Sequence, residues 1–164
     1  MMKWEELPVV KMTALDCAFV CTNMREDDFL ETSSLTFAKT RDAMAKATLD
    51  EVGEHYTVLN RKGEPVIIGG AYYDNPQVAT IWLFATDKIT KRDWWVATQF
   101  IIGLIDRMFE NGMARRIQTF SIGWRHVSHK WFKRLGLKQE ACLKGFTEDG
   151  LDLLIFSKVK IFLF

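Results

Sequence analysis

The sequence has no excess of charge of either sign and no long apolar run. Its 22 basic and 21 acidic residues leave a formal net charge of +1. Such a chain has no long-range field to hold a polyphosphate backbone, so we expect no nucleic-acid partner. The longest apolar runs, such as Phe100 to Ile105, fall far short of the roughly 20 residues that span a bilayer, so we also expect no membrane partner.

Cysteine is scarce, and no secretory leader is evident. The three cysteines have no C-x-x-C spacing, and their odd number argues against a disulfide framework. We interpret Cys17, Cys21 and Cys142 as small core thiols in a reducing compartment. The first residues carry Glu5 and Glu6 instead of a basic stretch before an apolar segment, so no signal peptide is predicted. A cytoplasmic protein is expected.

The sequence contains no repeat, linker or low-complexity stretch, so residues 1–164 are predicted to form one domain. The expected order is strand, two helices, three meander strands, helix, strand, helix and two strands. The predicted strands cover residues 9–12, 56–61, 65–73, 77–86, 115–122, 139–146 and 151–159. This order favours an α/β domain with a mixed sheet and helices on both faces.

Capping signals place the first two helices. Thr13 with Asp16 three residues later forms a capping box that opens the first. Its core-facing residues are expected to be Leu15, Phe19 and Val20. Ser33 or Ser34 is expected to cap the second helix. Its apolar stripe would consist of Leu35, Ala38, Met44 and Ala47.

The third predicted helix is the clearest. Thr90 and Asp93 form its capping box, and Asn111-Gly112 is typical of a helix end. Its apolar stripe consists of Trp94, Ala97, Thr98, Ile101, Leu104, Ile105 and Met108. A fourth helix is expected over 126–135. Within it, Trp131 and Phe132 are adjacent, so at most one of them is expected to point fully inward.

Residues 125–137 carry the most informative motif, Arg-His-Val-Ser-His-Lys-Trp-Phe-Lys-Arg-Leu-Gly-Leu. It resembles the fourth-helix signature of the GNAT N-acetyltransferase superfamily. The nearest resemblance is to a tailed-phage branch of GNAT-like or internal virion proteins. Residues 24–31, 63–66, 82–87 and 145–150 resemble further segments of that branch, in the same order. The resemblance covers residues 9–158.

The resemblance implies a mostly antiparallel central sheet flanked by about four helices. It also implies an enzyme that transfers acetyl from acetyl-CoA to an amine, with the acceptor unknown. The alternative is a catalytically degenerate member that acts as a virion component or a host-protein binder. For a phage-encoded protein, the location would be the host cytoplasm or the virion.

The resemblance places the cofactor at the end of the third meander strand and the start of the third helix. The predicted cofactor-binding residues are Phe84, Ala85, Thr86, Lys88, Thr90, Lys91, Arg92 and Arg125. Residues 87–95 contain no glycine, whereas the family's phosphate loop there is glycine-rich. Side chains should obstruct close backbone approach, and Asp93 would repel a phosphate, although the three cations of this junction could contact one.

The predicted catalytic residues are Asp87 as base and His129 as acid. Asp87 follows the central strand, and it is equally plausible as a turn residue. Phe132 occupies the position where many GNAT enzymes have a tyrosine acid. Either His126 or His129 could protonate a leaving thiolate, although surface positions are the commoner role for such a pair. No metal site is expected.

The sequence allows two functions for each of two charged segments and for the apolar tail. The acidic residues of 26–31 could hold a cationic substrate or be solvated. The same alternatives, with an anionic ligand, apply to the basic residues Arg125, Lys130, Lys133, Arg134, Lys138 and Lys144. The tail 160–164 could extend the last strand or, left exposed, mediate oligomerisation.

Overall fold

The computed structural model describes residues 2–161, which form a seven-stranded sheet in the order β1-β2-β3-β4-β5-β7-β6. All neighbouring strands are antiparallel except β4 and β5. The strands are β1 Val9–Lys11, β2 Gly53–Leu59, β3 Pro65–Asn75, β4 Val78–Ala85, β5 Arg116–Ile122, β6 Lys138–Leu143 and β7 Leu153–Val159. The predicted mixed, mostly antiparallel α/β sheet is confirmed.

The described residues contain five α-helices, one more than the sequence predicted. They are α1 Ala14–Thr22, α2 Glu26–Leu35, α3 Arg41–Asp50, α4 Lys91–Glu110 and α5 His126–Arg134, preceded by a short 3₁₀ turn at Trp4–Glu6. Helix α4 begins at the predicted capping box of Thr90 and Asp93 and ends before Gly112, which has a φ of 68°. That prediction is confirmed.

The predicted second helix is wrong, because two helices cover its region. Ser33 and Ser34 lie in the last turn of α2, where their hydroxyls donate to the carbonyls of Leu30 and Glu31. The capping residue is Thr40, whose Oγ1 accepts the Ala43 N–H at the start of α3. A serine hydroxyl can either cap the start of a helix or bond to a carbonyl in the last turn of the helix before it. The pair Ser33-Ser34 alone does not show which of the two it does.

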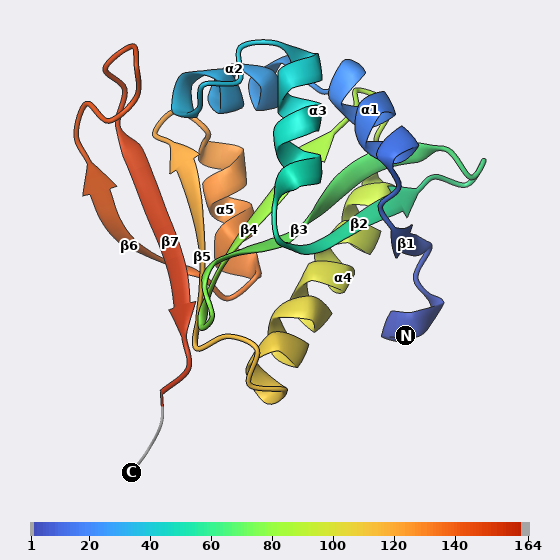
Figure 1. Cartoon of the computed structure of the whole chain (residues 1–164). Coiled ribbons are helices and arrows are strands. Elements are labelled where there is room, and N and C mark those ends of the chain that lie inside the picture. Colours follow the sequence, from blue (N-terminus) through green and yellow to red (C-terminus); the bar gives the residue numbers. More distant parts are fainter. Residues whose placement is uncertain (1, 162–164) are drawn as a thin grey trace.

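The sheet lies between two helical layers (Figure 1). Helices α1, α2 and α3 lie on one side, and α4 and α5 on the other. The larger core lies under α4 and α5, and the smaller one under α1 and α3. The smaller core shows that α1 faces inward through Cys17, Val20 and Cys21. The expectation for Leu15 and Phe19 was wrong, because these side chains are 83% and 43% exposed.

Other predictions about single side chains are corrected. Cys142 is exposed, whereas Cys17 and Cys21 are buried thiols. Trp131 and Phe132 are both buried, because α5 is covered by α4 on one flank and by Phe156 of β7 on another. Ile161 is 80% exposed, and Phe162 to Phe164 lie outside the described residues. Within residues 2–161, no helix combines the length and hydropathy needed to cross a bilayer.

Candidate functional site

The candidate site lies where the two parallel strands separate. β4 and β5 are paired only from Val78 with Arg116 to Thr80 with Gln118. The two strands therefore separate after Thr80. Beyond this point β4 stays paired with β3, and β5 with β7, so the sheet splits between its two halves.

Every second residue of β4 directs its backbone N–H and C=O into the gap between β4 and β5. Thr86 donates its N–H to Val66 of β3, so Ile81, Leu83 and Ala85 direct their backbone groups toward β5. The Ile81 carbonyl accepts from Thr119 Oγ1, at 3.0 Å. Alternation therefore leaves the N–H and C=O of Leu83 at the edge of the gap.

The main chain of Ala85 is held by the start of α2. Its N–H donates to Asp28 Oδ2 at 3.0 Å, and its carbonyl accepts from the Arg25 N–H at 2.8 Å. Met24 and Thr86 extend this contact as an isolated β-bridge. The turn between α1 and α2 therefore covers the end of the β4 edge.

A cavity of about 430 Å³ opens at the gap. The sheet contributes Thr80, Trp82, Phe84 and Phe120 to it, and Leu83 borders it. Further lining residues come from α2, α3, α5 and the loop between β6 and β7, including Leu35, Thr48, Glu51, Trp131 and Phe146. A volume of this size suits a small organic ligand.

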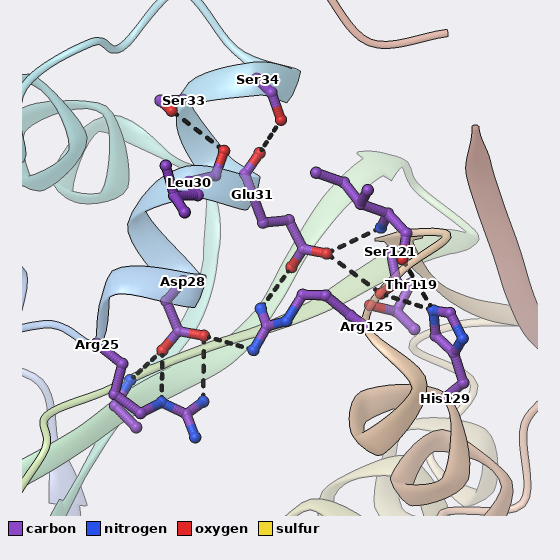
Figure 2. A network of polar contacts seen from close by, with 12 residues as sticks. Arg25, Asp28, Leu30, Glu31, Ser33, Ser34, Thr119, Ser121, Arg125 and His129 are labelled. Carbon is purple, nitrogen blue, oxygen red and sulfur yellow. Dashed lines mark hydrogen bonds and ion pairs between the residues drawn. The ribbon is translucent and has the colours of Figure 1, made fainter. Parts of the chain in front are cut away.

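A buried ion network ties α2 to both sides of the gap (Figure 2). Arg125, which precedes α5, contacts Asp28 at 2.9 Å and Glu31 at 2.8 Å. Asp28 is also paired with Arg25, at 3.1 Å. Glu31 accepts hydrogen bonds from the Ile122 N–H and from Ser121 Oγ. Burial raises the pKa of Glu31 above its usual range, although the charge of Arg125 opposes the rise.

This network corrects the interpretation of Asp28 and Glu31, whereas Glu26 and Asp27 of the same segment are exposed. Asp28 is only 3% exposed and is neutralised by arginine, so it is neither solvated nor free for a cationic substrate. Arg125 is likewise engaged by two carboxylates. The sequence showed both charged segments, but their pairing depends on the packing of α2 against the N-terminus of α5.

His129 lies at the inner side of the network. Its Nε2 is 3.1 Å from both Ser121 Oγ and the Ile122 carbonyl. Burial lowers its pKa, and since the carbonyl can only accept, a hydrogen bond to it requires the proton on Nε2. The ring is stacked on Phe156 and does not line the cavity. Its role as an acid stays a prediction.

The start of α4 is closed by its own side chains. Asp93 is fully buried, accepts the Thr90 N–H and is paired with Arg92 at 3.0 Å. Arg92 also donates to the Leu59 carbonyl. Because Thr90 and Asp93 satisfy each other, the remaining donors of this turn are the N–H groups of Lys91 and Arg92.

Helices α4 and α5 are joined by two tryptophans. Trp94 and Trp131 have ring centroids 4.9 Å apart, and Trp131 Nε1 donates to Thr98 Oγ1 at 2.9 Å. The guanidinium of Arg25, the N-cap residue of α2, lies 5.6 Å from the Trp94 ring centroid. These side chains fill the space between the two helices near the gap.

The other predicted site residues are distributed around the gap. Phe84 lines the cavity, and Thr86 is buried. Asp87 and Lys88 are exposed in the turn after β4, outside the cavity lining. The structure therefore brings Phe84, Ala85 and Arg125 together and leaves Asp87 apart. Its role as a base stays a prediction. Within residues 2–161, no three His, Cys, Asp or Glu side chains gather as a metal site would require.

No protein-family model and no curated protein sequence matches the chain. Solved structures do match. The ribosomal-protein N-acetyltransferase RimL, in complex with coenzyme A, has a TM-score of 0.72 at 10% identity, with 93% of each chain covered. A GNAT superfamily phosphinothricin acetyltransferase from Sinorhizobium meliloti, in complex with acetyl-CoA, has a TM-score of 0.72 at 13% identity, covering 93% of this chain and 87% of that one.

A variant of the spermidine N-acetyltransferase SpeG from Vibrio cholerae is also similar. Its TM-score is 0.70 at 11% identity, with 93% of this chain and 95% of that chain covered. At these identities the likeness establishes the fold, and the chain has the GNAT fold, as the sequence predicted. The resemblance to a tailed-phage branch stays a prediction.

Proposed function

We propose that this GNAT-fold chain is an acetyl-CoA-dependent N-acetyltransferase with a small-molecule or protein amine as acceptor. The observation that carries the proposal is the separation of β4 and β5 after Thr80, which opens a cavity beside the main chain of Leu83. Structures with this fold include acetyltransferases in complex with coenzyme A and acetyl-CoA. The chain is expected to act in the cytoplasm.

The acyl end of acetyl-CoA fits the described residues. When bound, the cofactor supplies an acetyl group activated as a thioester. The Leu83 N–H is a donor placed to stabilise negative charge on an acyl oxygen, and a donor of this kind contributes strongly to acyl transfer. The cavity extends from there to α2 and α3, which leaves room for an amine.

The part of the site expected to hold the cofactor's phosphates carries positive charge but has no glycine-rich loop. Lys88 and Lys91 are exposed at the turn into α4 and supply charge-assisted contacts for phosphate. The N–H groups of Lys91 and Arg92 are the helix donors for an anion there. Between the two ends, Arg25 and Asp28 hold Ala85, so binding along this edge requires the start of α2 to move.

Replacing Lys91 with alanine should weaken acetyl-CoA binding about two- to five-fold, the effect of losing one exposed charge contact. Isothermal titration calorimetry measures this directly. Lys46→Ala, which removes an exposed lysine from α3, is the matched control and should leave the affinity unchanged. Absence of binding at millimolar acetyl-CoA would defeat the proposal.

A second candidate is a non-catalytic GNAT-fold protein that serves as a virion component or binds a host factor. It is favoured by the contacts of Ala85 with Arg25 and Asp28, which occupy a main-chain edge that a cofactor would need. The buried Phe132, which has no ionisable hydroxyl, agrees with it. Detection of the chain in purified phage particles, without acetyl-CoA turnover, would support this candidate over the first.

A further inference from the structure

Three buried polar atoms beside the cavity have no hydrogen-bond partner among the described residues. They are Glu51 Oε2, His55 Nε2 and Trp82 Nε1. They belong to one cluster, because Glu51 Oε2 and His55 Nε2 are 3.9 Å apart and the His55 and Trp82 ring centroids are 5.6 Å apart. Buried polar groups are nearly always satisfied, so three neighbouring exceptions indicate a place for a ligand or an ordered water.

The fold brings these residues together from three elements. Glu51 follows the last turn of α3, His55 lies in β2 and Trp82 in β4. Gly70 of β3 is paired with both His55 and Trp82, so the two rings meet across a position that has no side chain. Glu51 and Trp82 line the cavity, whereas His55 lies behind them.

The cluster lacks a positive charge. Burial raises the pKa of Glu51 to about 7 and lowers the pKa of His55. The other titratable groups that face Glu51 are Cys17 of α1 and Tyr72 of β3, and neither supplies a cation. The Glu51 side chain is 34% exposed, with its Oε2 buried. The two arginines of the cavity lining, Arg25 and Arg125, are paired with Asp28 and Glu31.

The acid should make stability depend on pH. A carboxyl group with a raised folded-state pKa favours folding below its unfolded value and loses that contribution as pH rises through about 7. Glu51→Gln should therefore raise the melting temperature at pH 8 relative to the wild type, and the difference should shrink at pH 5. Thermal unfolding at the two pH values measures this, and an equal difference at both would show that Glu51 is solvated.

The chemistry of the cluster and its walls defines the ligand class. Glu51 Oε2 accepts hydrogen bonds, as an ammonium group requires, whereas the Trp82 Nε1–H can only donate and is left for an ordered water. The ring of Trp82 attracts cations over its face. The apolar and aromatic part of the wall includes Leu35, Phe84, Phe120 and Phe146. A small primary amine with an apolar body satisfies both parts.

We propose that Glu51, with the ring of Trp82 beside it, binds the ammonium group of a small organic amine whose apolar body lies in the cavity. The identification of this amine as the acetyl acceptor rests on the proposed function. Binding of the amine does not, because the site is made by α3, β2 and β4 and needs no cofactor.

Titration with 2-phenylethylamine, followed by ¹H–¹⁵N spectra of the intact chain, tests the proposal. The indole N–H signal of Trp82, assigned through Trp82→Phe, should shift on binding. Because only ionised Glu51 attracts the ammonium, the affinity should rise about ten-fold from pH 6 to pH 8. 2-Phenylethanol, which has the same body without the charge, should bind much more weakly.

Glu51→Gln should weaken amine binding and remove its pH dependence, whereas Asp50→Asn, at the exposed neighbouring acid, should change neither. Equal binding of the amine and the alcohol, or an unshifted Trp82 signal, would overturn the proposal and leave an ordered water as the partner of the three atoms. Amine binding without acetyl-CoA binding would retain this site and reject the acetyltransferase. The reverse result would reject the site alone.

Discussion

Replacing Arg125 with methionine should lower the free energy of unfolding by about 3–5 kcal/mol, because removing one member of a buried ion network leaves uncompensated charge. The Arg125 side chain is 11% exposed and contacts both Asp28 and Glu31. Without it, Asp28 keeps Arg25, but Glu31 keeps only neutral donors, the Ile122 N–H and the Ser121 hydroxyl. Urea denaturation at pH 7 measures the loss.

The pH dependence identifies the cause. The pKa of Glu31 is already raised by burial, and loss of Arg125 raises it further, so the variant should be destabilised more at pH 8 than at pH 5. The added change Glu31→Gln should recover part of the loss at pH 8. Lys144→Met, which breaks the exposed pair with Asp152, should leave stability almost unchanged, because water screens an exposed ion pair. Equal losses in these two single variants would contradict a buried network.

Replacing Gly70 with alanine should destabilise the fold by about 3 kcal/mol or more, since both backbone strain and a steric clash contribute. Gly70 has a φ of 153°, and a Cβ there would lie 1.9 Å from the Glu54 carbonyl oxygen in β2. That oxygen belongs to the main chain of a paired strand, so relief requires β2 and β3 to separate locally. Thermal and urea denaturation measure the effect.

Gly63→Ala is the matched control for Gly70→Ala. Gly63 also has a positive φ, 77°, in the turn between β2 and β3, but no atom lies within 4 Å of its would-be Cβ. Its replacement should cost about 1 kcal/mol, the strain of a left-handed residue alone. If the two variants lost equal stability, the close approach of β2 to Gly70 would not be the cause.

Local sequence signals predicted the elements whose stability is local. The capping box of Thr90 and Asp93 and the long apolar stripe located α4, and Lys62-Gly63 located the turn between β2 and β3. Helix α2 was missed, because its sequence is polar and its stabilising contacts are made by Asp28 and Glu31 with distant segments. No pattern within 26–35 contains that information.

The orientation of α1 illustrates the same limit. Its sequence offers two competing faces, one with Leu15 and Phe19 and the other with Cys17 and Cys21. The bulkier side chains favoured the first face. Packing against Met44 of α3 and Ile68 of β3 selects the second, because the close contact between α1 and α3 accommodates small thiols.

The candidate site was predicted only in part. The end of β4 and Arg125 were identified from the resemblance, and both lie at the gap between β4 and β5. Glu51 and His55 carry no motif, so nothing in the sequence distinguishes them from other polar residues. They become noticeable only as buried atoms without partners.

The sequence by itself determined the order of the strands along the chain, the position of α4, the α/β class and the absence of a glycine cradle at the start of α4, because these depend on residues close in the chain. Only the tertiary structure decided that Arg125 neutralises the acids of α2, that Arg25 and Asp28 cover Ala85, and that Glu51 meets His55 and Trp82. These contacts join segments far apart in sequence, and their charge balance depends on burial, which exists only after the segments have packed.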